Sequence, residues 1–91
     1  MKPPSHIDGA LVLEWAWSDV PFGHVPFTDG TVAATIHGLA LCQYPDSQTI
    51  YRFNCNASWE TEQDMDYSSL TEAKTLLPKQ YQATPVVWQK A

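Results

Sequence analysis

The stretch from Thr31 to Tyr67 constrains the fold most, because its alternating pattern predicts two consecutive β-hairpins that lead into a helix. Side chains alternate between the two faces of a strand, so the even positions after Thr31 form one face. A turn follows at Pro45 and Asp46, since proline presets φ and aspartate bonds to nearby backbone. The even set reads Val32, Ala34, Ile36, Gly38, Ala40, Cys42 and Tyr44.

The strand over residues 49–55 fixes the register of the first hairpin. Its aromatic side chains fall opposite the small residues of the preceding strand. A slip by one residue would move the aromatic side chains to the polar face, so the register is well specified. We expect three pairs on one face, Cys42 with Tyr51, Ala40 with Phe53 and Gly38 with Cys55.

The second hairpin turns at Asn56-Ala57-Ser58 and continues into the most regular alternation of the chain, residues 59–67. Asparagine suits the turn because it tolerates the left-handed region. A tight turn here pairs Cys55 with Trp59, Phe53 with Thr61 and Arg52 with Glu62.

A helix follows directly. Ser69-Leu70-Thr71-Glu72 matches the capping box, and the apolar residues after it share one helical face. Pro78 cannot donate to the preceding turn, so we expect the helix to end near Leu77. The small residues of the even face leave room for it to dock there. The helical face holds Leu70, Ala73, Leu77 and Tyr81.

The flanking segments complete one expected domain, residues 1–91. Residues 1–9 read as a loose N-terminal arm, and Ala10–Ser18 alternates as a strand. Asp29-Gly30 predicts a two-residue hairpin turn that pairs Thr28 with Thr31. Residues 84–89 indicate a last short strand, or else a disordered tail. The fold class is therefore α+β, an antiparallel β-meander of about five strands with one helix packed on one face.

The charge balance narrows the classes of partner. The formal net charge is −5, and the five Lys and Arg residues are scattered along the chain. Nucleic-acid binding needs clustered cations, so neither a nucleic acid nor an anionic membrane is an expected partner. No stretch is apolar enough for a signal peptide or a membrane span, which favours a cytoplasmic location. We expect Cys42 and Cys55 to be free, buried thiols.

No motif for catalysis, a cofactor or a metal is present. The chain lacks a glycine-rich phosphate loop, a Gly-x-Ser-x-Gly motif and a Cys-x-x-Cys motif. Its three histidines lack metal-ligand spacing. We therefore expect a non-enzymatic protein. An acidic row remains, which either receives a cation or basic partner or protects an exposed sheet edge. That row is Glu60, Glu62, Asp64 and Asp66.

Two groups of side chains are candidates for ligand binding. A polar cluster on the face away from the helix suits a small polar ligand, or else is a solvated sheet face. An apolar loop suits a functional segment, or else folds over the core edge. The cluster is His37, Arg52, Asn54 and Glu62, and the loop carries Phe22, His24 and Phe27.

Self-association is the favoured mode of action. One helix cannot cover a five-stranded sheet, so the opposite face is expected to be bare and to form a homodimer. The segment Val86–Trp88 is expected to cap that face within the chain or to reach across to a second chain. The function expected is that of a small acidic protein acting through protein–protein contact. The alternative is a small-molecule-binding protein or an enzyme that uses the sheet face around His37, Arg52 and Asn54. The expected interface is Leu39, Leu41, Ile50, Trp15, Trp17 and Trp88.

Overall fold

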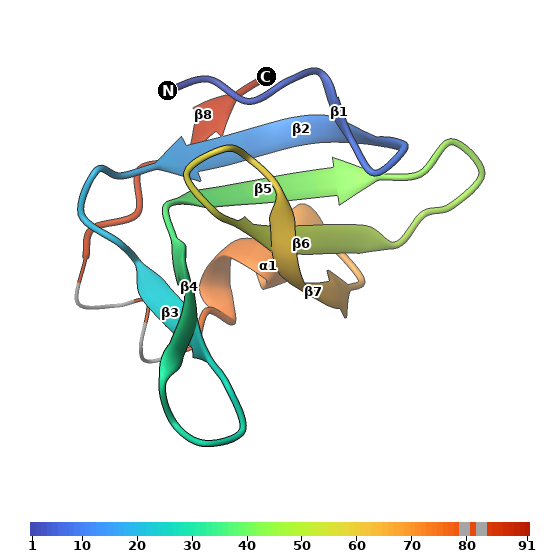
Figure 1. Cartoon of the computed structure of the whole chain (residues 1–91). Coiled ribbons are helices and arrows are strands. Elements are labelled where there is room, and N and C mark those ends of the chain that lie inside the picture. Colours follow the sequence, from blue (N-terminus) through green and yellow to red (C-terminus); the bar gives the residue numbers. More distant parts are fainter. Residues whose placement is uncertain (79–80, 82–83) are drawn as a thin grey trace.

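The computed structural model describes residues 1–78, 81 and 84–91. Figure 1 shows a curled antiparallel sheet with a separate hairpin at one end and both termini along one edge. The strands run in the order β1-β2-β5-β6-β7, and β8 also pairs with β2. The strands are β1 (His6–Ile7), β2 (Ala10–Trp17), β3 (Gly23–Pro26), β4 (Val32–Ile36), β5 (Gly38–Gln43), β6 (Ile50–Cys55), β7 (Thr61–Tyr67) and β8 (Gln89–Lys90), and the helix is α1 (Leu70–Thr75).

The central hairpin of β5 and β6 has the predicted register. Cys42 pairs with Tyr51, Ala40 with Phe53 and Gly38 with Cys55. The match of small and aromatic residues on one face accounts for this pairing. The chain is thus mostly antiparallel sheet with a single short helix among the described residues.

The long strand predicted from Val32 onward is interrupted at His37. β4 leaves the main sheet and pairs only with β3, so the two strands form a separate hairpin. The backbone N–H of Phe27 donates the closing hydrogen bond to the carbonyl of Thr31. The turn between them therefore has three residues, not the two predicted. Gly30 has a φ of 90°, which fits a type I turn followed by a left-handed residue.

The second hairpin differs from the predicted register. Cys55 lies opposite Thr61, and Arg52 lies opposite Met65 instead of Glu62. The turn is wider than expected, because the Asn56 side chain accepts from two backbone N–H groups within it. Trp59 takes a left-handed φ of 60° and turns its ring inward, so it leaves the strand.

The face of small residues is covered by tryptophan side chains, not by the helix. The ring of Trp59 packs directly over Gly38 and lies 5.5 Å from the ring of Trp17 and 6.3 Å from that of Trp15. This tryptophan cluster also takes in the N-terminal segment through Ile7. The predicted docking of the helix on this face is therefore wrong, because Trp59 fills the room that the small residues leave.

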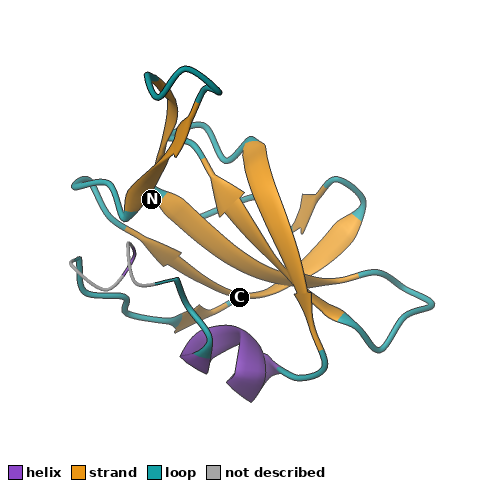
Figure 2. Ribbon diagram, turned by 90° about the horizontal axis from the view of Figure 1, so that it is seen from below, coloured by secondary structure: helices purple, strands orange, loops and turns teal. Residues whose placement is uncertain are grey.

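The helix contacts the opposite face instead. Ala73 of α1 packs in one cluster with Leu41, Ile50 and Tyr67. Figure 2 shows α1 along that side of the curled sheet. Lys74 adds an ion pair of 3.1 Å with Glu14 of β2.

The predicted helix start is confirmed, and the helix is shorter than expected. The Ser69 hydroxyl accepts a hydrogen bond from the backbone N–H of Glu72, and the Glu72 carboxylate accepts one from the Ser68 hydroxyl. The last helical residue is Thr75, two residues before Leu77. Among the described helices, none combines the length and apolar character that a membrane crossing needs.

Both chain ends lie on the outer edge of β2. His6–Ile7 pairs with the start of β2 and Ile7 is buried, so the predicted loose arm is wrong in its last residues. The last strand forms at Gln89–Lys90 and pairs with β2 of the same chain, so the strand predicted over residues 84–89 is wrong except at its last residue. A β-bulge after Val12 inserts one extra residue into β2 and reverses the alternation of side chains beyond it. The apolar residues of β2 therefore do not all lie on one side of the sheet.

Candidate functional site

A buried arginine on β6 is the most unusual polar group of the fold. The Arg52 side chain is 2% exposed and lies on the face that α1 contacts. Its Nε donates to Oδ1 of Asn54 at 2.9 Å, and its Nη1 donates to the Tyr67 hydroxyl at 2.5 Å. Asn54 in turn donates from Nδ2 to the Tyr81 hydroxyl at 3.1 Å. The hydrogen bonds fix the orientation of both Arg52 and Asn54.

Two aromatic rings partly replace the water that Arg52 has lost. The guanidinium carbon lies 5.4 Å from the ring centroid of Tyr67 and 5.9 Å from that of Tyr81. A ring face attracts a cation within about 6 Å, and more strongly when water is excluded. Both tyrosines therefore bind Arg52 through their rings, and Tyr67 also through its hydroxyl.

No carboxylate pairs with Arg52 among the described residues. The salt bridge found in that part of the chain joins Lys74 to Glu14. Two of the five guanidinium N–H groups donate to described residues. Buried charges are normally paired, because desolvation of an unpaired charge is costly. Arg52 is thus a candidate anion-binding group.

A cavity of about 430 Å³ lies beside this arginine. One wall comes from Arg52 and Asn54, and the opposite wall comes from β7. Two exposed carboxylates stand on the β7 side, so the cavity combines a buried cation with outer anions. Its lining is Arg52, Asn54, Pro78, Glu62, Gln63, Asp64 and Met65.

The predicted polar cluster is only partly assembled. Arg52 and Asn54 are together but lie on the same side of the sheet as α1, so the predicted placement away from the helix is wrong. The Ser18 carbonyl accepts from Nδ1 of His37, and the His37 ring packs against Trp17 at 5.9 Å. Glu62 instead accepts from the Asn56 amide. His37 and Glu62 therefore make separate structural contacts.

The predicted apolar loop does not form one site. Phe22 is 2% exposed and belongs to the core, whereas the His24 side chain is exposed. Phe27 lies at the β3–β4 turn and is 58% exposed. The hairpin separates these side chains, because Phe22 precedes β3 and Phe27 follows it.

The predicted interface is also corrected. Leu39, Leu41 and Ile50 are buried, because residues of α1 and the C-terminal segment pack against them. They do not form the bare surface that was expected. Three further members of that predicted set, Trp15, Trp17 and Trp88, are half-buried and pack against core clusters.

Sequence reasoning missed the two tyrosines that hold Arg52. Tyr67 ends the alternation of β7, and Tyr81 follows Pro78 by three residues. The available signal was an arginine in a largely apolar and aromatic strand, since a buried cation requires aromatic or polar partners. Tyr67 reaches Arg52 from the end of β7 and Tyr81 reaches it from beyond α1, so their positions depend on the tertiary fold.

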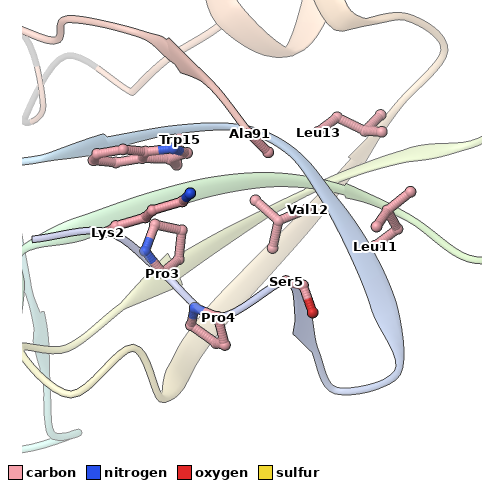
Figure 3. A pocket seen from close by; sticks show the side chains of 9 residues that line it. All are labelled: Lys2, Pro3, Pro4, Ser5, Leu11, Val12, Leu13, Trp15 and Ala91. Carbon is pink, nitrogen blue, oxygen red and sulfur yellow. The ribbon is translucent and has the colours of Figure 1, made fainter.

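A second cavity, of about 490 Å³, lies along the outer edge of β2 (Figure 3). The N-terminal residues form one wall, and Ala91 closes the end at which β8 pairs with β2. The indole Nε1 of Trp15 is buried here without a hydrogen-bond partner among the described residues. The lining is Lys2, Pro3, Pro4, Ser5, Leu11, Val12, Leu13, Trp15 and Ala91.

No cluster of metal-ligating side chains occurs in the described part of the chain. No protein-family model, curated protein or solved structure matches this chain.

The two cysteines are free and buried in the tryptophan cluster, which predicts a dependence of stability on pH. Burial raises the pKa of Cys42 and of Cys55 from 9.0 to about 12. The protonated thiol is thus favoured in the folded state, so this stabilisation is complete below pH 9 and is lost as the pH rises toward 12. Urea unfolding at stepped pH measures the loss. Cys42→Ala is expected to flatten the curve, and an unchanged slope would contradict the assignment.

Proposed function

We propose that this protein is a small acidic protein that acts through contact with other protein chains and forms a homodimer through the β3–β4 hairpin. One observation carries the proposal. The hairpin stands away from the main sheet and exposes large apolar side chains at its tip (Figure 1), where Phe27 is 58% and Val32 is 56% exposed. Apolar groups gathered on one projecting element are typical of contact sites.

The same hairpin is anchored firmly at its base. Ile36 is fully buried, Ala34 is half-buried and Val32 is exposed, so one apolar row leads from the core to the tip. An isolated two-stranded hairpin is only marginally stable in water. A second copy of the chain that packs its hairpin tip against this row would bury the exposed apolar side chains of both hairpins. A symmetric dimer needs only this one surface, because both chains contribute the same patch.

The sheet face that carries Leu41 is not part of the proposed interface, because α1 and the C-terminal segment pack against it. The free Cys42 and Cys55 support a reducing compartment such as the cytoplasm.

Light scattering after gel filtration tests the dimer. We expect a dimer mass for the wild-type protein and a monomer mass for Phe27→Asp, because a charge at the tip would have to be desolvated in the contact. Val87→Asp is the matched control, since Val87 is 64% exposed in the C-terminal segment, and it is expected to remain a dimer. A monomer mass for the wild type at high concentration would refute the proposal.

The second candidate, a small-molecule binder, is supported at Arg52 and Asn54 but not at His37. The supporting observation is the buried guanidinium beside the cavity of about 430 Å³. Thermal shift with a panel of small carboxylic acids tests it. A rise in melting temperature that is lost in Arg52→Met supports this function, whereas a rise retained in that variant counts against it.

A further inference from the structure

We propose that the outer edge of β7 binds an extended, basic segment of a partner protein by strand addition, with one acidic side chain of that segment held by Arg52. This goes beyond the proposed self-association and does not depend on it, because β7 and the β3–β4 hairpin are separate surfaces.

The first support is the open edge. β7 pairs with β6 on one side, and no described strand lies on its other side. Residues 62–66 are all exposed. Alternate residues of an edge strand direct N–H and C=O groups outward, where an added strand can pair with them.

The second support is the acidic face of this edge. Asp64 lies opposite Phe53 and Asp66 lies opposite Tyr51, so by strand alternation both residues belong to the side of the tryptophan cluster, and Asp64 also borders the cavity beside Arg52. No cation pairs with either carboxylate among the described residues. Directly opposed charges of opposite sign stabilise a strand pair, so residues of an added strand that face this side are expected to be Lys or Arg.

The third support comes from the other face of the same edge. Met65 lies opposite Arg52 and Gln63 lies opposite Asn54, and all four line the cavity. Side chains of an added strand that face this side would stand beside the cavity that Arg52 lines. Arginine binds a carboxylate through parallel hydrogen bonds, so we expect an Asp or Glu at this position.

These faces together define the partner. Residues alternate sides along a strand, so the bound segment carries basic residues at every second position and an acidic residue between two of them. A second copy of this chain does not fit at the same edge, because like charges placed opposite each other repel. The acidic row thus excludes β7 of another copy and admits a basic segment.

Two synthetic peptides of equal composition test the proposal by calorimetric titration. Lys-Thr-Lys-Glu-Lys-Thr-Lys places all lysines on one face and the glutamate on the other. Lys-Thr-Glu-Lys-Lys-Thr-Lys moves the glutamate to the lysine face and directs a lysine at Arg52. We expect the first peptide to bind at least about tenfold more tightly than the second. Backbone N-methylation of the first peptide is expected to abolish binding, because it removes the strand hydrogen bonds.

Variants assign the two faces separately. Asp64→Asn is expected to weaken binding of the first peptide several-fold, whereas Asp46→Asn makes the same charge change in the exposed β5–β6 turn and is expected to leave it unchanged. Arg52→Met is expected to reduce the preference between the peptides, leaving the part that the acidic face of β7 provides. Asp64 is exposed, so its variant tests the edge even where the Arg52 variant fails to fold. Equal affinity for the two peptides would overturn the proposal.

Discussion

Replacing Trp59 by alanine is expected to lower the free energy of unfolding by about 3–5 kcal/mol, the usual loss for a large aromatic side chain removed from a core. The ring is 7% exposed and packs against Gly38, Trp15 and Trp17. It also holds its own backbone at a φ of 60°, a region that bulky residues rarely adopt. Urea unfolding measures the change, with Trp59→Phe as the control that keeps an aromatic ring and is expected to lose less.

The close approach of Trp59 to Gly38 permits a sharper version of this experiment. A Cβ at position 38 would lie 2.5 Å from Cζ3 of Trp59, so Gly38→Ala is expected to cost about 1–3 kcal/mol through overpacking. In the Trp59→Ala background the clash is absent, and Gly38→Ala is expected to cost much less. The two effects are therefore strongly non-additive. Additive losses would show that the ring does not occupy the space over Gly38.

Replacing Arg52 by alanine is expected to cost about 2–5 kcal/mol, the range for removing a long buried side chain. The substitution removes the buried stem together with the guanidinium that lies over the rings of Tyr67 and Tyr81, and it leaves Oδ1 of Asn54 buried without its donor. An unsatisfied buried acceptor adds about 1–3 kcal/mol to such a loss. The midpoint of urea unfolding at constant slope gives the change.

Arg52→Met separates packing from charge in that result. Methionine refills the volume of the stem without a charge that must be desolvated, so we expect this variant to be more stable than Arg52→Ala. Equal stability of the two variants would show that the guanidinium, and not the stem, provides the contribution. Wild-type stability in Arg52→Ala would show that Arg52 is not part of the core.

The central hairpin was predictable because its register depends on neighbouring residues alone. Gly38, Ala40 and Cys42 match the side chains of β6 in only one alignment, and a slip reverses both faces. The helix start at Ser69 was predictable for the same reason, since a cap is a contact within four residues. The site was only half predictable. Arg52 and Asn54 alternate on one strand, but Tyr67 and Tyr81 reach them from later parts of the chain.

The sequence by itself determined the antiparallel character of the sheet, the pairing of β5 with β6 and the acidic character of β7, because strand alternation and local charge are properties of adjacent residues. Only the tertiary structure decided which face each element covers. The small residues on β5 leave a space that a helix or an aromatic ring can fill, and Trp59 fills it because the β6–β7 turn widens and directs its ring inward. The helix therefore contacts the opposite face, where Arg52 is buried beside Tyr67 and Tyr81.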